Sequence, residues 1–403
     1  MTASVDPVRL TQDLIRIPSI TPADEGAMDL VQTQLEQLGF TCRRMAFEGI
    51  ENLYARRGTE GPNLCFAGHT DVVATGPLEA WRHPPFAAEI EDGVLYGRGA
   101  ADMKGCIAAW IAAVDGVLSR GEPGGSLSLL ITGDEEGRAI HGTKVVVQAL
   151  MDEGEVIDAC VVGEPSSARA LGDTIKIGRR GSLNAWITVK GRQGHVAYPE
   201  RAANPAPVLA RLLAELDAHV LDEGYPEFPP SNLEITTIDI ANPAMNVIPD
   251  TATGRLNIRF NPAHTGESLM AWIRERVEAA QGASGCGVGV EFLHSGDAFL
   301  TEQGPFVLAV QDAVEAVTGR RPEPSTSGGT SDARFITRMA PVLELGLVGQ
   351  TIHQIDERVP VQEIIDLTRV YERVIEGYLA RCDAGRNFER AGQASAALHS
   401  FGP

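Results

Sequence analysis

The sequence contains no apolar run long enough to cross a membrane. None of its hydrophobic stretches approaches the roughly 20 residues of a transmembrane helix, although 43% of the 403 residues are hydrophobic. The first residues, Met1 to Asp6, also lack the basic and apolar regions of a secretory signal peptide. We therefore expect a cytoplasmic protein with a full hydrophobic core, and its length is enough for two domains.

Basic residues are scarce. Lys and Arg number 34 against 54 Asp and Glu, so the formal net charge is -20 at pH 7. A surface this acidic repels phosphate backbones and anionic lipid headgroups, which argues against a nucleic-acid partner and against a membrane partner. A small anionic substrate would need a local basic pocket to overcome the same field.

Cysteine is infrequent, and no Cys-x-x-Cys pair occurs. The six cysteines are scattered, mostly among apolar residues: Cys42, Cys65, Cys106, Cys160, Cys286 and Cys382. This usage is typical of reduced, buried thiols in a cytosolic protein rather than of a disulfide framework. Any metal would therefore have to be bound by histidine and carboxylate side chains.

Several catalytic motifs are missing. The chain has no Walker phosphate loop, no Gly-x-Ser-x-Gly elbow and no His-Glu-x-x-His. Gly97–Asp102 imitates a dinucleotide fingerprint, but it lacks the final glycine and does not follow a clear strand. The sequence therefore gives no local support to a serine nucleophile or to a bound dinucleotide.

Three consecutive carboxylates stand in the segment Gly133–Gly137, directly after the apolar run Leu127–Ile131. Adjacent carboxylates repel one another, and a bound cation would relieve the repulsion. Neighbouring residues of an extended chain point to opposite sides, so Glu135 and Glu136 are able to face a substrate and a metal respectively. The alternative is an acidic turn that caps the next helix, where carboxylates are favoured.

Predicted strands and helices alternate in the first 180 residues and again after residue 295. Short apolar runs predict strands at Asn63–Ala67, Leu127–Ile131, Ala159–Val162 and Val342–Leu347. Helical spacing of apolar residues predicts helices at Pro7–Arg16, Ala27–Leu38, Cys106–Leu118, Gly142–Met151, Phe306–Val317 and Val361–Leu379. This alternation favours an α/β domain with a mixed, largely parallel sheet flanked by helices.

The pattern changes between these two parts of the chain. Residues 181–294 read as strand, helix, strand, strand, helix and strand, which is the split βαβ order of a ferredoxin-like α+β domain. We therefore predict a discontinuous α/β domain, residues 1–180 and 295–380, into which this α+β domain is inserted. The remaining residues, 381–403, are polar and rich in small side chains, and we expect a flexible tail there.

Six side chains that are able to bind a divalent cation are placed in turns after apolar segments: His69, Asp102, Glu135, Glu136, Glu164 and His353. In α/β sheets, ligands bind beyond the carboxyl ends of the strands. Each residue has an ordinary alternative, because a histidine is often structural and Asp102 could cap the following helix. Their recurrence at successive strand ends favours a two-metal site of the kind that Zn²⁺ occupies. Asp71, two residues after His69, is placed to accept a hydrogen bond from the imidazole.

Several of these segments, taken together, match a known family. Phe66–Asp71, Gly97–Gly105 and Gly133–Glu136 resemble the co-catalytic zinc aminoacylase and carboxypeptidase (M20) family. A second group of segments narrows the resemblance to one branch of it: Val162–Ser167, Gly178–Ser182, Gly194–Pro199, Ser327–Asp332 and Thr351–His353. The likeness covers about residues 5 to 380. It implies a zinc-hydrolase catalytic domain, an inserted dimerisation domain and a homodimer.

The resemblance implies two Zn²⁺ ions per subunit, with Co²⁺ or Mn²⁺ as alternatives. Asp102 would bridge the two ions, His69 and Glu164 would complete one site, and Glu136 and His353 the other. Glu135 would be the general base, and Asp71 would orient His69. His195 would reach the partner subunit's active site and stabilise the oxyanion.

A substrate site is implied as well. The matching positions are Arg179, Tyr198, Asn246, Arg259, Ser295, Gly329 and Thr330. Guanidinium groups bind carboxylates through two parallel hydrogen bonds, so Arg179 and Arg259 suit an anionic substrate; the alternative for each is a surface salt bridge. Gly329 would let backbone amides approach a substrate carboxylate, or it marks an ordinary tight turn. The family usually has two consecutive asparagines where this chain has Met245 and Asn246.

The implied reaction is hydrolysis of N-succinyl-LL-2,6-diaminopimelate to succinate and LL-2,6-diaminopimelate, a step of lysine and diaminopimelate biosynthesis. Two alternatives stay open. One is a related hydrolase of the family, such as an acetylornithine deacetylase, a dipeptidase or a carboxypeptidase. The other is a non-catalytic binding or scaffold protein on the same fold, which would be signalled by loss of Glu135 or of a ligand, and none is lost.

Overall fold

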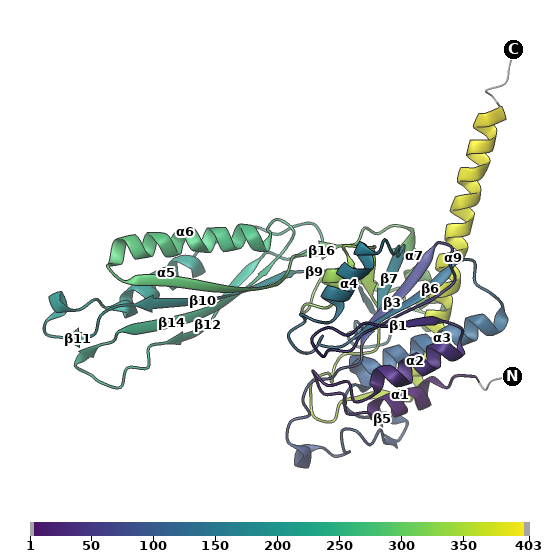
Figure 1. Cartoon of the computed structure of the whole chain (residues 1–403), viewed down its shortest axis with the longest axis horizontal. Coiled ribbons are helices and arrows are strands. Elements are labelled where there is room, and N and C mark those ends of the chain that lie inside the picture. Colours follow the sequence, from purple (N-terminus) through teal and green to yellow (C-terminus); the bar gives the residue numbers. More distant parts are fainter. Residues whose placement is uncertain (1–3, 399–403) are drawn as a thin grey trace. The chain divides into compact units, whose positions relative to one another are not determined.

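The computed structural model describes residues 4–398, with the backbone alone at 383–398. The chain forms two compact units (Figure 1). Of the described residues, the first comprises 4–177, 301–325 and 331–398, and the second comprises 178–300 and 326–330. Within residues 4–398, no helix is long and apolar enough to cross a membrane.

An eight-stranded sheet forms the centre of the first unit, in the order β1-β2-β6-β3-β7-β18-β8-β17. Its strands are β1 (Thr41–Arg44), β2 (Leu53–Arg57), β3 (Asn63–His69), β6 (Ser126–Thr132), β7 (Ala159–Val162), β8 (Thr174–Lys176), β17 (Glu323–Ser325) and β18 (Val342–Glu344). The pairs β3–β6, β3–β7, β7–β18 and β8–β17 are parallel, and the other three pairs are antiparallel. The predicted mixed, largely parallel sheet is confirmed.

Helices cover this sheet and explain why its central strands are buried throughout. They are α1 (Pro7–Ile15), α2 (Ala27–Gln37), α3 (Gly105–Arg120), α4 (Thr143–Asp152), α7 (Pro305–Thr318), α8 (Ala333–Ile336) and α9 (Val361–Leu398). Every residue of β3, β6 and β7 is buried. Trp110 of α3 stacks on Phe66 of β3 at 4.8 Å between ring centroids, and Tyr371 of α9 meets both rings edge-on. A small sheet of β4 (Ile90–Glu91), β5 (Val94–Tyr96) and β19 (Arg358–Pro360) completes the unit.

The second unit is a four-stranded antiparallel sheet with two helices on one face (Figure 1). In chain order its main elements are β10 (Gly181–Lys190), α5 (Pro205–Asp217), β12 (Asn232–Asp239), β14 (Thr251–Phe260), α6 (Gly266–Ser284) and β15 (Gly287–Gly296). Side chains of β10 and β14 alternate between buried and more exposed, as strands covered on one face do. The expected insert, residues 181–294, lies within this unit. The short strands of the second unit are β9 (Gly178–Arg179), β11 (Gly194–His195), β13 (Val247–Ile248) and β16 (Phe299–Leu300).

The last helix is longer than the sequence predicted. Its end was expected at Leu379, but α9 continues to Leu398. The physical reason is that the segment after Leu379 contains no proline up to Leu398 and is rich in Ala and Arg, which are strong helix formers. Flexibility of residues 381–403 stays a prediction, and residues 399–403 lie outside the described residues.

Candidate functional site

Parallel pairing brings three of the predicted ligand segments to one edge of the first unit's sheet. His69 is the last residue of β3 and pairs with Thr132, the last residue of β6. The acidic turn therefore begins directly beside His69. β7 ends at Val162, opposite Ala67 of β3, so Glu164 follows at the same edge. This is the edge at which α/β sheets bind ligands.

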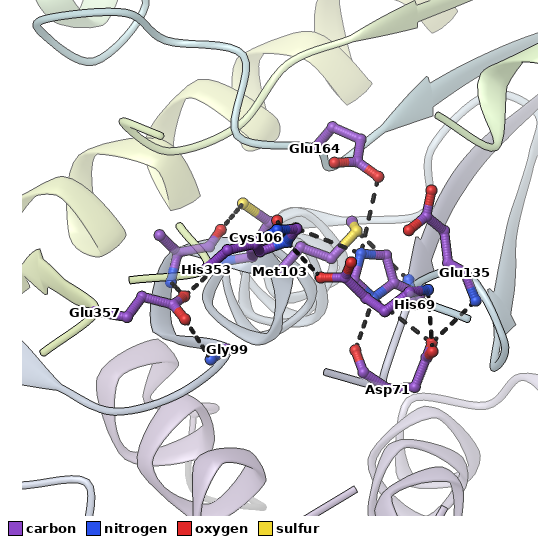
Figure 2. A network of polar contacts seen from close by, with 12 residues as sticks. His69, Asp71, Gly99, Met103, Cys106, Glu135, Glu164, His353 and Glu357 are labelled. Carbon is purple, nitrogen blue, oxygen red and sulfur yellow. Dashed lines mark hydrogen bonds and ion pairs between the residues drawn. The ribbon is translucent and has the colours of Figure 1, made fainter. Parts of the chain in front are cut away.

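Asp102 lies between two imidazoles. Its Oδ1 is 3.4 Å from Nε2 of His69, and its Oδ2 is 3.3 Å from Nε2 of His353. His69 Nε2 is also 3.8 Å from Glu164 Oε1, and His353 Nε2 is 2.9 Å from Glu136 Oε1. Figure 2 shows Glu164 and Glu135 on different sides of the His69 ring. The arrangement divides into two half-sites that share the Asp102 carboxylate.

These donor atoms suit metal ions better than they suit one another. His69 Nε2 and Asp102 Oδ1 are buried and make no hydrogen bond among the described residues, and leaving buried polar atoms unpaired is costly. Ligand atoms of His69, Asp102 and Glu136 lie within 4.8 Å of one another, and so do those of His69, Glu135 and Glu164. Imidazole nitrogens and carboxylate oxygens are donors that Zn²⁺ accepts. The residues therefore fit a pair of divalent cations.

Asp71 holds a different contact from the one that its spacing predicted. The Nδ1 atom of His69 is 2.8 Å from the backbone carbonyl of Asp71 and 3.7 Å from its carboxylate. A proton on Nδ1 is donated to that carbonyl, so Nε2 is the ring nitrogen that faces the site. The Asp71 carboxylate instead accepts the backbone N–H groups of Glu135 at 3.3 Å and Glu136 at 3.1 Å. Asp71 thus orients the imidazole through its main chain and the two glutamates through its side chain.

The ionisable groups of the site shift one another's pKa values. Burial, reinforced by the nearby Asp332 carboxylate, raises the pKa of Glu135 to about 8. Burial also raises the pKa of Glu164 well above its usual range. Hydrogen bonds to Asp102 and Glu136 raise the pKa of His353 to about 10. Burial opposes ionisation of Asp102, but His353 and His69 together hold its pKa below the ordinary value. Without metal, the cluster therefore retains protons at neutral pH.

Asp134, the remaining member of the acidic turn, closes the turn itself. Its carboxylate accepts the backbone N–H groups of Arg138 at 2.8 Å, Ile140 at 2.8 Å and His141 at 3.1 Å. The following helix, α4, begins at Thr143 after Gly142 and has no side-chain cap. The alternative interpretation of the acidic turn as a cap of the next helix is therefore wrong, because the loop after Glu135 and Glu136 is long enough to need its own acceptor, which is Asp134.

The remaining predicted residues belong to the second unit, where all except Arg259 and Ser295 form two groups. In one group the rings of His195 and Tyr198 are 5.7 Å apart, and the carbonyl of Asn246 accepts the Val196 N–H at 3.1 Å. In the other, Arg179 Nη1 donates to the Ser327 carbonyl at 3.2 Å, in the same turn as Gly329 and Thr330. Arg259 and Ser295 lie on β14 and β15, the two strands that flank β10.

Two buried carboxylates beside the metal-ligand cluster were not assigned from the sequence. Asp332 is the last residue of the segment Ser327–Asp332, in which only Gly329 and Thr330 were assigned a role. Its negative charge helps to raise the pKa of Glu135. Glu357 stands four residues after His353 and is fully buried. In the sequence, only their positions close to assigned residues pointed to them. Their burial, which the sequence does not show, is what distinguishes them from loop carboxylates.

Comparison with known proteins agrees with this geometry. The model of the family described as Peptidase family M20/M25/M40 matches residues 65–377. A succinyl-diaminopimelate desuccinylase of Caulobacter sp. (strain K31) is 63% identical over 383 residues, which cover 94% of this chain and 97% of that protein. The desuccinylase of Phenylobacterium zucineum is 62% identical over 381 residues, covering 94% of this chain and all of that protein (100%).

Solved structures share the fold at much lower identity. The crystal structure of an M20 family metallo-carboxypeptidase from Sulfolobus solfataricus superposes with a TM-score of 0.77 at 17% identity, covering 93% of this chain and 99% of that one. At such identity the likeness concerns the fold alone. The family match, the extent of the identity to the two desuccinylases and the shared fold lead to one conclusion: the chain belongs to peptidase family M20.

Proposed function

We propose that this chain is a metal-dependent amidohydrolase that cleaves N-succinyl-LL-2,6-diaminopimelate to succinate and LL-2,6-diaminopimelate, in lysine and diaminopimelate biosynthesis. The observation that carries the proposal is the pair of half-sites that share Asp102, with the Glu135 carboxylate beside them. The high identity to the named desuccinylases over nearly the whole chain supports the choice of substrate.

Two divalent cations would occupy the cluster, with Zn²⁺ as the expected ion and Co²⁺ or Mn²⁺ as alternatives. His69 and Glu164 would bind one, Glu136 and His353 the other, and Asp102 would bridge them. When bound, the ions supply Lewis acidity, which polarises an amide carbonyl and makes water more acidic. The protein supplies the orientation of these donors, because Asp71 holds both the imidazole of His69 and the backbone of the two glutamates.

Glu135 would act as the general base. Its side chain is half-buried, and loss of solvent around the carboxylate raises its pKa to about 8 in the metal-free protein, so it is a group that can hold a proton near neutral pH. It would accept a proton from the attacking water and deliver it to the nitrogen of the leaving amine. Both transfers need one carboxylate at a fixed position, which the Asp71 hydrogen bond to its backbone N–H provides.

The second unit would bind the substrate and join two subunits into a homodimer. Arg179 and Arg259 would bind substrate carboxylates, with Tyr198, Asn246, Ser295, Gly329 and Thr330 as further contacts. His195, an exposed residue of β11, would stabilise the oxyanion in the partner's active site. The reaction would take place in the cytoplasm, where the buried free thiols Cys65, Cys106 and Cys160 stay reduced.

The test of this function is a turnover comparison on one purified, metal-loaded protein. Substrates are N-succinyl-LL-2,6-diaminopimelate, acetylornithine and a set of dipeptides. We expect kcat/KM to be at least about 100-fold higher for the succinyl compound, because a site built for two anionic ends leaves charged groups unpaired with the others. The comparison is needed because Met245, fully exposed at 100%, replaces a polar residue that the family usually has. A preference for acetylornithine or a dipeptide would contradict the proposal.

Metal binding should release protons. In the metal-free protein His353 has a pKa of about 10 and Glu135 one of about 8, both raised, so protonated forms dominate at pH 7. An imidazolium cannot ligate a metal, so loading must displace its proton, and metal affinity should rise as pH rises toward these values. We expect on the order of one proton or more per chain at pH 7. Isothermal titration calorimetry in buffers of different ionisation enthalpy measures it, and a heat independent of the buffer would contradict the prediction.

A further inference from the structure

Glu357 is a fully buried carboxylate with an unusual set of partners. Its Oε2 accepts Nη1 of Arg98 at 2.8 Å and the backbone N–H of Gly99 at 3.0 Å. Its Oε1 accepts the backbone N–H of Ala101 at 3.0 Å and that of Asp102 at 3.1 Å. Both oxygens are thus fully used, and one of the four donors is the main chain of the proposed bridging ligand itself (Figure 2 shows Glu357 beside Gly99).

The main chain of Glu357 strengthens the same connection. Its carbonyl accepts the Gly97 N–H at 2.9 Å. Just beyond, β19 pairs with β5, with Arg358 opposite Tyr96. The segment from Gly97 to Asp102 is therefore wrapped around a single residue, by backbone contacts at its start and by side-chain contacts at its end. These contacts hold the backbone of Asp102, from which its carboxylate projects, in a defined position.

Glu357 also belongs to the segment that carries His353. Thr351 Oγ1 accepts the Arg358 N–H at 3.1 Å and donates to the Arg358 carbonyl at 3.1 Å, which closes the turn between them. Within that turn His353 has a φ of 60°, a left-handed conformation that a non-glycine residue adopts only when its surroundings hold it. The Glu357 carboxylate therefore joins the turn of one proposed ligand to the backbone of another.

We propose that Glu357 is a positioning residue of the metal centre, which sets the distance between Asp102 and His353 before any metal binds. This inference rests on the proposed two-metal function. The carboxylate never reaches the ions in this role; it acts through the Asp102 backbone and through its own chain connection to His353. Arg98, which is only 2% exposed, pairs with this buried carboxylate at 2.8 Å and offsets its charge.

A plain structural ion pair would need only the Arg98 contact. Three backbone N–H groups from one turn add nothing to charge balance, but they specify the path of that turn to within hydrogen-bond geometry. Carboxylates that orient ligands in this way typically contribute 10- to 100-fold to metal affinity or activity. The two explanations therefore differ in what a conservative substitution should change.

The experiment is Glu357→Gln in the full-length chain, titrated with Zn²⁺ and with Co²⁺. However its amide is turned, the NH₂ group faces two N–H donors, so at least one pair of contacts is lost. We expect the dissociation constant of at least one ion to rise about 10- to 100-fold and the Co²⁺ absorption spectrum to change. Asp222→Asn is the matched control, because Asp222 accepts backbone N–H groups of Gly224 and Ser231 in a turn without proposed ligands. That variant should bind both ions as the unsubstituted protein does.

Hydrogen exchange of the unsubstituted protein gives a test that does not depend on how the variant folds. If Glu357 positions the turn before metal binds, the amides of Gly99, Ala101 and Asp102 are protected in the metal-free protein. Protection that appears only after metal loading would overturn the proposal. So would a folded Glu357→Gln protein with unchanged affinity and spectrum. If the unsubstituted protein itself fails to bind two ions, it is the proposed function that fails, which keeps the two failures distinguishable.

Discussion

Replacement of Glu135 by glutamine is expected to lower kcat by about 10²- to 10⁴-fold while both metal ions stay bound. Glutamine keeps the size and the backbone contact to Asp71 but cannot accept and return a proton. The proposed ligands are other residues, so metal content, measured by elemental analysis of the purified variant, should remain at two ions per chain. KM should change much less than kcat, because the lost interaction belongs to the chemical step.

Asp134→Asn is the matched control for this experiment. Asp134 is the neighbouring carboxylate of the same turn, and its partners are the backbone N–H groups of Arg138, Ile140 and His141. An asparagine there retains one acceptor oxygen, so we expect a lower melting temperature and a kcat reduced less than about 10-fold. Near-normal turnover of Glu135→Gln, or an equal loss in both variants, would remove Glu135 from the role of general base.

The second large effect is expected from mixing two inactive proteins. Asp102→Ala removes the shared carboxylate of the two half-sites and should abolish turnover, because neither ion keeps its full ligand set. His195→Ala should reduce kcat about 10²- to 10³-fold, the range for losing one oxyanion donor. If His195 acts in the partner's active site, a mixed dimer regains one complete site, made of the metal ligands of one chain and the histidine of the other.

Random exchange of two subunits places about half of the dimers in the mixed form, each with one complete site out of two. An equal mixture should therefore recover about a quarter of the unsubstituted activity, provided that subunits are exchanged and mixed dimers are verified by differential tagging. The control is a mixture of Asp102→Ala with Glu135→Gln, which both damage the same chain's site and should not complement. Verified mixed dimers without recovered activity would show that His195 serves its own subunit or no active site.

Local sequence was enough to predict the class of the fold. Leu127–Ile131 and Ala159–Val162 are apolar at every or nearly every position because parallel strands covered on both faces bury both sides, and such runs are visible without a structure. The alternation in β10 and β14 is visible for the converse reason, since one face of that sheet is left uncovered by helices. Helix ends are less certain: α9 passes Leu379 because no residue there stops it.

For the proposed metal centre, the sequence determined the chemistry of the donors and their places after strands. It did so because only a few side-chain types bind divalent cations, and here they recur in turns after strands, where α/β sheets bind ligands. Tertiary structure decided which atoms meet. Asp71 holds His69 through its backbone carbonyl, 2.8 Å from Nδ1, and not through its carboxylate, which is 3.7 Å from the same atom. The carboxylate holds the two glutamates instead. Glu357 acquires its contacts with the Asp102 turn across 255 positions of the chain, and spacing along a sequence contains no information about a distance of that kind.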